Sequence, residues 1–275
     1  MIASTLVVLA LSVLGFASPV EKRAISTTVL SDLTRYTQYA SAAYQGSCRS
    51  PLGNTLVKTF SGLATGYIAR DDTRKEIIVS FRGSVSSQDF QTDGETALIA
   101  FTSPGVSAGS GVLAHQGFLT AYNTAASTII STVKAQLAAH PGYTLVSTGH
   151  SLGGALSSLG GLSLKSNFPS SNVRLFTFGQ PRTGNPAYAA LVESVVGTSN
   201  IFRDGVPTII PQSAGYQHHA VEFWNFADPP TAANVKQCTG DEDPTCSDSI
   251  PSGGINQAHL TYFGQAMGRD ASLCT

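Results

Sequence analysis

The chain has 275 residues, and its 16 Lys and Arg against 17 Asp and Glu give a formal net charge of −1. This length suits one large domain or two small ones, and it is sufficient to bury a hydrophobic core. Charged residues make up only 12% of the chain, about half the usual share, and no Lys/Arg cluster is present to bind nucleic acid. Apolar residues make up 42%, which excludes a disordered chain.

The first residues predict a secreted protein. Residues 2–16 are almost entirely apolar, and an Ala-Ser-Pro sequence follows at residues 17–19. The apolar run is too short to cross a bilayer comfortably, so a membrane anchor is the less favoured alternative. We therefore expect residues 1–18 to be a signal peptide.

A dibasic pair follows this segment at Lys22 and Arg23. Such a pair is a processing site, so residues 19–23 are expected to form a short pro-segment and the mature chain to begin near Ala24. No later apolar run has membrane-spanning length. We expect a soluble extracellular protein without stable membrane insertion.

The mature chain alternates between two kinds of apolar pattern, which indicate helices and buried strands. In chain order we expect a helix over residues 28–44, strands over 65–69 and 76–81, a helix over 116–139, a strand over 143–147, a helix from 151 to about 165 and a strand over 173–178. This order is typical of an α/β fold with a mostly parallel central sheet flanked by helices. No linker or repeat divides residues 24–275, so one domain is predicted.

The most informative segment is Gly-His-Ser-Leu-Gly at residues 149–153, between a predicted strand and a predicted helix. It fits the nucleophile elbow, in which flanking glycines let strand and helix approach closely and lift the serine above the sheet. The N–H of Leu152 then lies at a helix N-terminus, where partial positive charge stabilises an oxyanion. A serine that only caps the helix would leave the paired glycines unexplained, so we favour Ser151 as a nucleophile.

A serine nucleophile requires a base, and the base requires an orienting carboxylate. The order Ser, acid, His along the chain favours His259 as the base. Asp204, at a predicted turn, is the best-placed acid. The adjacent His218 and His219 are interpreted as structural residues or as residues that line the pocket.

The other acidic residues after Ser151 are less suitable as the catalytic acid. Glu193 lies in a predicted helix, and Asp228 lies in a loop before two prolines. Glu222 lies within the strand-like segment 220–226 and could bond to backbone or to histidine. The acidic run at 241–243 is interpreted as a solvated loop.

The four cysteines are even in number, as expected of disulfides in a secreted protein. Three pairings are possible. Cys238 and Cys246 flank the acidic loop and could close it, in which case Cys48 and Cys274 would tie the first helix to the C-terminus. The cysteine and histidine spacings do not favour a zinc site.

Taken together, these motifs resemble the fungal class 3 lipase family, which includes the feruloyl esterases of type A. The resemblance covers nearly all of residues 24–275 and implies an α/β-hydrolase fold and carboxylic-ester hydrolysis. The matching segments are Phe81-Arg-Gly-Ser84, Gly149-His-Ser-Leu-Gly153, Phe178-Gly-Gln-Pro-Arg-Thr-Gly-Asn185, Asp204-Gly-Val-Pro207, Gly215-Tyr-Gln-His218, Val221-Glu-Phe-Trp224 and Ala258-His-Leu-Thr-Tyr-Phe263.

The resemblance also implies roles for single residues. It makes Ser151 the nucleophile, Asp204 the acid and His259 the base, and it assigns the oxyanion hole to Ser84 and Leu152.

The C-terminal cysteines are similar to those of the feruloyl esterases of this family. That similarity supports the pairs Cys238–Cys246 and Cys48–Cys274.

One segment departs from the family. Members usually have a longer strand before the acid, whereas here Phe202 and Arg203 run directly into Asp204, as if about four or five residues, roughly one strand, were absent. A family member without catalytic activity is therefore one alternative.

The substrate is less well determined by the sequence. The segment after the Phe-Arg-Gly-Ser motif is the family's lid, and here only Val85 and Phe90 are apolar within residues 85–93. We expect these two residues and His218 to line the substrate site. A polar lid gains little from binding a lipid–water interface, although the apolar segment 97–101 could compensate or could belong to the core.

The favoured function is a secreted lipase that hydrolyses lipid esters such as acylglycerols. A feruloyl or cinnamoyl esterase acting on plant cell-wall esters is the alternative within the same chemistry. The reaction requires neither a metal nor an organic cofactor, and we expect a monomer that contacts its ester substrate and no nucleic acid.

Overall fold

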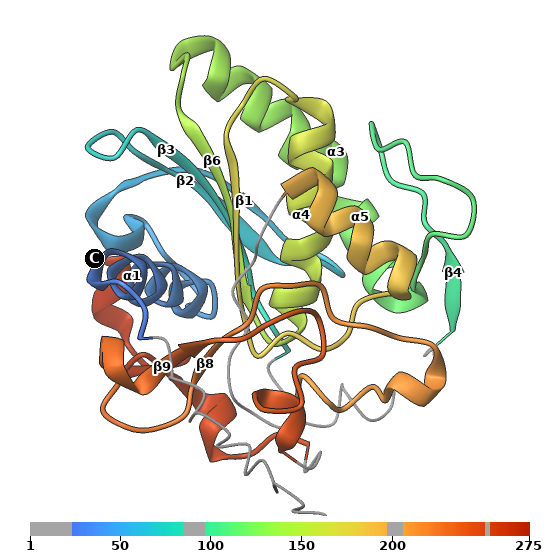
Figure 1. Cartoon of the computed structure of the whole chain (residues 1–275). Helices are drawn as coiled ribbons and strands as arrows, with labels where there is room; N and C mark the ends of the chain where they lie inside the picture. Colours follow the sequence, from blue (N-terminus) through green and yellow to red (C-terminus); the bar gives the residue numbers. More distant parts are fainter. Residues whose placement is uncertain (1–23, 85–96, 197–205, 251–253) are drawn as a thin grey trace, which may run out of the picture.

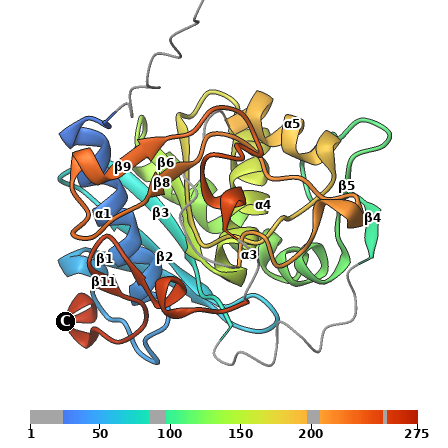
Figure 2. The ribbon, with the colours of Figure 1, turned by 60° about the horizontal axis from the view of Figure 1, so that its bottom comes forward.

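The computed structural model describes residues 24–84, 97–196, 206–250 and 254–275. A central sheet separates two layers of helices (Figure 1). Helix α1 (Thr27–Ala42) packs on one face, and α3 (Gln116–Ala139), α4 (Leu152–Asn167) and α5 (Pro186–Val196) lie on the other. Residues after 206 lie across the carboxyl end of the sheet, as the orange and red segments show in Figures 1 and 2.

Within the described part of the chain the central sheet has the strand order β1-β2-β3-β6-β7. Strands β3, β6 and β7 are parallel, whereas β1 and β2 join the sheet in antiparallel fashion. Short turns link β1 to β2 and β2 to β3, and a short turn can only join antiparallel neighbours. The bounds are β1 Thr55–Phe60, β2 Gly66–Asp71, β3 Glu76–Phe81, β6 Thr144–His150 and β7 Val173–Phe178. The predicted parallel arrangement thus holds for the centre of the sheet, and the strand predicted at 65–69 is the antiparallel β2.

Both faces of the sheet are buried, which explains why its central strands are almost continuously apolar. In β3, Ile77, Val79 and Phe81 pack toward α3 and α4, whereas Ile78 packs toward α1. Helix α4 approaches the sheet closely because it is rich in small residues. A Cβ at Gly160 would lie 3.0 Å from both the Phe81 ring and the Ser147 hydroxyl, so a larger residue would not fit there without movement.

Three short hairpins complete the described strands. They pair β4 (Leu98–Ala100) with β5 (Leu113–His115), β8 (Phe223–Asn225) with β9 (Val235–Gln237), and β10 (Thr261–Tyr262) with β11 (Gln265–Ala266). The apolar segment 97–101 thus includes β4, and Phe101 belongs to the core.

Two disulfides fix segments that contain little regular structure. Cys238 bonds to Cys246, and Cys48 bonds to Cys274 in the 3₁₀-helix η6 (Ala271–Cys274). The second bond holds the segment after α1 against the end of the chain. Both are the pairs that the family resemblance implies.

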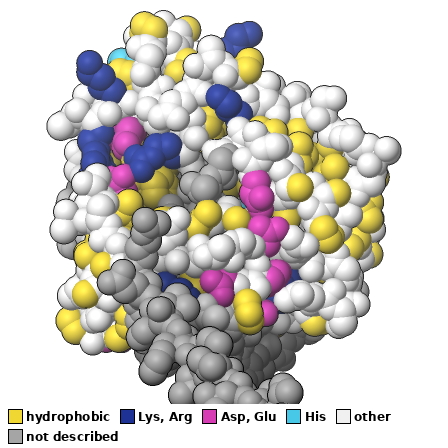
Figure 3. All heavy atoms as spheres, in the orientation of Figure 1, with side chains coloured by type: hydrophobic (Ala, Val, Ile, Leu, Met, Phe, Trp, Pro, Cys, Tyr) yellow, Lys and Arg dark blue, Asp and Glu magenta, His cyan; other side chains and the backbone are white. Residues whose placement is uncertain are grey.

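The surface carries few charged side chains. On the face shown in Figure 3, uncharged polar side chains and backbone predominate, and acidic and basic side chains form only small groups. Among the described residues Leu63 is the one large apolar side chain that is strongly exposed. None of the described helices has the length and apolar character needed to cross a membrane.

The two disulfides are expected to stabilise the fold unequally. They join residues 226 and 8 positions apart, and the larger loop restricts the unfolded chain more. In the chain-entropy account the losses on removal are about 5 and about 2 kcal/mol, respectively. Urea unfolding of the Cys48→Ala/Cys274→Ala and Cys238→Ala/Cys246→Ala double variants measures both losses. An equal or smaller loss for the Cys48–Cys274 pair would contradict the prediction.

Candidate active site

Ser151 stands at the tight turn between β6 and α4. Its backbone angles are φ 63° and ψ −130°, a positive φ that is uncommon for a residue with a side chain. Its N–H donates to the carbonyl of Phe178 in β7, at 2.8 Å. A Cβ at Gly149 would lie 2.1 Å from the Gly153 carbonyl oxygen, so glycine is required where the strand and helix touch. The sequence 149–153 therefore has the geometry of a nucleophile elbow.

His259 reaches this turn from the other end of the chain. It lies in the 3₁₀-helix η5 (Gln257–Leu260), and the Asn256 side chain accepts a hydrogen bond from the His259 N–H, at 3.1 Å. The His259 Nε2 lies 2.9 Å from the Ser151 Oγ. Ser151 is 3% exposed and His259 is 2% exposed. The pair is therefore within proton-transfer distance and largely shielded from water.

Two backbone segments flank the Ser151 side chain. Leu152 is the first residue of α4, so its N–H lies at the positive end of the helix. On the other side, a Cβ at Gly83 would lie 3.0 Å from the Ser151 Cβ, so the segment that leads into Ser84 is in close contact with the nucleophile. Both segments expected to form an oxyanion hole are thus beside Ser151.

Three further residues expected in the site, Val85, Phe90 and Asp204, lie outside the described residues. The shortened segment before Asp204 also lies there, so the assignment of the acid stays a prediction.

Comparison with known proteins places the chain in a family. Residues 78–213 match the family described as Lipase (class 3). A lipase of Rhizopus niveus is 35% identical over 268 aligned residues, which cover 87% of this chain and 65% of that lipase. A secreted alkaline triacylglycerol lipase of Penicillium cyclopium is 32% identical, covering 86% of this chain and 84% of the relative. The chain belongs to the class 3 lipase family.

A solved structure of a relative extends this result to the fold. The crystal structure of a triacylglycerol lipase from Penicillium expansum superposes with a TM-score of 0.82 and 31% identity, covering 90% of this chain and 97% of that one. The α/β-hydrolase fold expected from the sequence is confirmed. The chain spans about two thirds of the length of the Rhizopus lipase.

Beyond the Ser151–His259 pair, the chain contains a buried charge that the sequence did not reveal. Arg182, 2% exposed, follows β7. Its guanidinium donates two hydrogen bonds to Glu242, at 2.8 and 2.6 Å, one to Asp248 at 2.9 Å and one to the Ile210 carbonyl at 2.8 Å. A buried guanidinium needs such counter-charges because water cannot solvate it. We call Arg182, Glu242 and Asp248 the arginine cluster.

The interpretation of residues 241–243 as a solvated loop is therefore wrong. Glu242 belongs to the arginine cluster, Asp241 accepts a hydrogen bond from the Gln217 side chain, and Asp243 accepts bonds from Thr239 and Thr245. Asp241 and Glu242 hold the loop closed by Cys238 and Cys246 against the rest of the protein, whereas Asp243 bonds within that loop.

His218 packs beside the arginine cluster. Its N–H donates to Glu242 at 2.8 Å, and its Nε2 lies 2.8 Å from the Pro207 carbonyl oxygen. Burial lowers the pKa of His218 to about 4, and burial also lowers the pKa of its neighbour His219 to about 3. These contacts favour the structural interpretation of His218 over the substrate-lining one.

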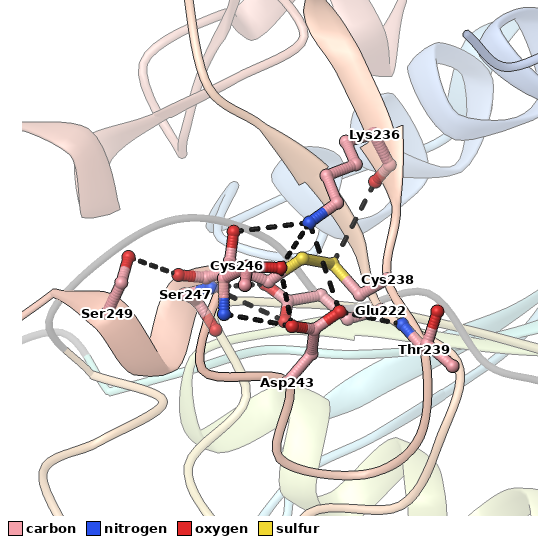
Figure 4. The surroundings of a disulfide bond; sticks show 9 residues. Glu222, Lys236, Cys238, Thr239, Asp243, Cys246, Ser247 and Ser249 are labelled. Atoms are coloured by element: carbon pink, nitrogen blue, oxygen red, sulfur yellow. Dashed lines mark hydrogen bonds and ion pairs between the residues drawn. A yellow bond between two sulfur atoms is a disulfide. The ribbon is translucent and has the colours of Figure 1, made fainter. Parts of the chain in front are cut away.

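Glu222 is buried against the Cys238–Cys246 disulfide (Figure 4). Its carboxyl accepts hydrogen bonds from the Ser247 N–H, and burial raises its pKa to about 8. Potential ligand atoms of Glu222, Cys238 and Cys246 lie within 4.8 Å of one another. Both sulfurs are used in the disulfide, however, so this group is not a metal site.

Sequence reasoning missed two residues that contact the site, His150 and Tyr44. The Tyr44 hydroxyl lies 2.7 Å from the His150 Nδ1. His150 stands inside the recognised motif, which was a usable signal, whereas Tyr44 looked only like the end of an apolar helix face.

Replacement of Glu222 tests its protonation. Between about pH 5 and pH 8 the unfolded chain ionises this carboxyl while the folded chain keeps it protonated, so folding stability is lost as the pH rises. Glu222→Gln keeps the size and the acceptor but does not titrate. We expect its free energy of unfolding, measured in urea at each pH, to fall less over this range than that of the wild type. The same slope in both proteins would contradict the assignment.

Proposed function

We propose that this chain is a secreted lipase that hydrolyses acylglycerol esters with Ser151 as the nucleophile. The observation that carries the proposal is the 2.9 Å contact between the His259 Nε2 and the Ser151 Oγ at a strained elbow. A serine and a histidine at this distance form an activated nucleophile, and the positive φ of Ser151 directs the side chain away from both flanking elements.

The proposed reaction has two acyl-transfer steps. His259 takes the proton of Ser151 as the hydroxyl attacks the ester carbonyl, and it then returns the proton to the leaving alcohol. The N–H groups of Ser84 and Leu152 stabilise the oxyanion. Asp204 orients His259 and stabilises its charged form. Water, activated by the same histidine, then releases the acid from Ser151.

Lipid esters are the preferred substrate class because the relatives described above are named as lipases and triacylglycerol lipases. Cinnamoyl esters share the same chemistry, but the names of these three relatives refer to lipases and not to cinnamoyl esterases. The Ser151–His259 contact favours an active member over one that has lost catalysis, because the two side chains lie at the distance that a nucleophile and its base require.

Substrate binding is assigned to the segment after Ser84, with Val85 and Phe90 as its apolar contacts. We propose that the lid contacts the lipid–water interface only weakly because most of its residues are polar. The protein is proposed to act as a monomer.

Secretion is proposed from the N-terminal segment, with residues 1–18 as the signal peptide and 19–23 as the pro-segment. The Penicillium cyclopium relative is named as a secreted enzyme, which supports this proposal.

Substitution of the nucleophile tests the mechanism. Ser151→Ala should lower the hydrolysis of tributyrin by at least 10³-fold, since removing the nucleophile of a triad can cost about 10⁶ in kcat. It should also abolish labelling by a fluorophosphonate probe. Ser131→Ala, which removes an exposed serine on α3, is the control and should retain wild-type rates.

Tributyrin, trioleoylglycerol and methyl ferulate, measured side by side, test the substrate class. Faster turnover of methyl ferulate would overturn the lipase assignment, and labelling that persists in Ser151→Ala would overturn the nucleophile.

The processing proposal is tested on secreted protein. We expect N-terminal sequencing to read from Ala24, because cleavage follows Lys22-Arg23. A mature chain that begins before residue 19 would contradict the prediction.

A further inference from the structure

A chain of hydrogen bonds runs behind the Ser151–His259 pair. His150 immediately precedes the nucleophile and is 3% exposed. Its Nε2 lies 2.8 Å from the backbone carbonyl oxygen of His259, and its Nδ1 lies 2.7 Å from the hydroxyl of Tyr44. One imidazole therefore contacts the backbone of the residue that activates the nucleophile.

The proton positions in this chain follow from the partners. A carbonyl oxygen only accepts hydrogen bonds, so the His150 Nε2 carries a hydrogen and donates it to His259. Burial holds the pKa of His150 well below its usual range, so the ring is neutral and its Nδ1 accepts. The Tyr44 hydroxyl therefore donates to that nitrogen. The direction of every bond is fixed from Tyr44 to the His259 carbonyl.

The Tyr44 hydroxyl also contacts the other side of the site. The Gly83 N–H hydrogen-bonds to it, and a Cβ at Gly83 would lie 2.1 Å from its oxygen. Gly83 directly precedes Ser84, which is assigned to the oxyanion hole. A second, longer contact of 3.4 Å joins the hydroxyl to the His150 carbonyl. One phenol thus joins the segment before the nucleophile to the segment of the oxyanion hole.

Tyr44 is itself held in place by the C-terminal part of the chain. Its ring packs against Gly268, where a Cβ would lie 2.9 Å from the Tyr44 Cβ. The neighbouring Gln45 side chain donates to the Gly268 carbonyl at 3.0 Å, and the Gly268 N–H donates to the Ser41 Oγ at 2.9 Å. The Cys48–Cys274 disulfide joins the same two parts of the chain covalently. These contacts fix the position of the Tyr44 side chain, and with it the position of its hydroxyl.

We infer that Tyr44 and His150 are positioning residues of the ester hydrolysis, which hold the His259 backbone and the Ser84 segment in register with Ser151. The inference rests on the proposed function. Neither side chain contacts the reacting atoms: they act through His259 and through the backbone at Gly83. A small displacement of either group reduces turnover because the reacting atoms must meet at near-contact distance.

Removal of one hydroxyl tests the inference. Tyr44→Phe should lower kcat on tributyrin on the order of tenfold with KM unchanged, because substrate contacts stay while alignment is lost. The rate constant of fluorophosphonate labelling should fall by a similar factor. Tyr67→Phe is the matched control, because it also removes a buried hydroxyl, which donates to the Tyr39 carbonyl at 2.8 Å away from the site. We expect the control to retain the wild-type kcat.

A pair of variants at His150 separates positioning from packing. The amide nitrogen of His150→Gln can take the place of Nε2 and donate to the His259 carbonyl, whereas His150→Met has similar length without a donor. The glutamine variant should retain several times the kcat of the methionine variant. Rates are expressed per folded enzyme, with the folded fraction taken from urea unfolding, so that loss of folded protein does not count as loss of catalysis.

The outcomes distinguish this inference from the proposed function. If wild type is active, Ser151→Ala is inactive, and Tyr44→Phe matches Tyr67→Phe, the inference is overturned and the proposed function stands. Equal rates per folded enzyme for His150→Gln and His150→Met would also overturn it. If the wild-type protein hydrolyses none of the esters, the proposed function itself fails.

Discussion

The contact between β6 and α4 at Gly149 and Gly153 is the constraint on which the site depends. The backbone can reverse there only because neither glycine has a side chain, and Ser151 between them adopts a positive φ that costs of order 1–3 kcal/mol. Hydrogen bonds within the central sheet offset this strain. β6 is paired on both sides by parallel strands, and the Ser151 N–H is bonded to β7. The strained Ser151 is thus held by buried strands of the central sheet.

The remaining parts of the site must then reach the carboxyl end of the sheet from distant positions in the sequence. The segment after residue 206 has few long helices or strands in its described part, so its position depends on individual contacts. The arginine cluster ties the loop closed by Cys238 and Cys246 to the segment after β7, and the Cys48–Cys274 disulfide ties the C-terminal residues to the segment after α1. These contacts act where a regular hydrogen-bond ladder is lacking, and they bring His259 to Ser151.

The sequence predicted those parts of the structure that depend on local residue patterns, and it missed those that depend on contacts between distant residues. β3, α3 and β7 were predicted at their observed bounds because their apolar patterns are strong, whereas the edge strand β1 was missed because most of its side chains are exposed or partly buried. A motif and the chain order led to Ser151 and His259, whose side chains lie 2.9 Å apart. Residues 241–243 were misjudged because a charged run looks solvated unless its buried partner, Arg182, about 60 residues away, is known. Tyr44 carried no local signal of its role.

The neutrality of His150 connects the fold to the chemistry. Its ring centroid lies 4.4 Å from that of His259, so a charge on His150 would oppose the charge that His259 gains in the proposed reaction, in which it takes the Ser151 proton. Burial holds the pKa of His150 far enough down to prevent this, and the same burial leaves its N–H free of water and directed at the His259 carbonyl. Inside the protein, His150 therefore stays neutral and donates a hydrogen bond to the backbone of His259, the proposed base. The chain can place two histidines side by side because burial keeps one of them, His150, neutral.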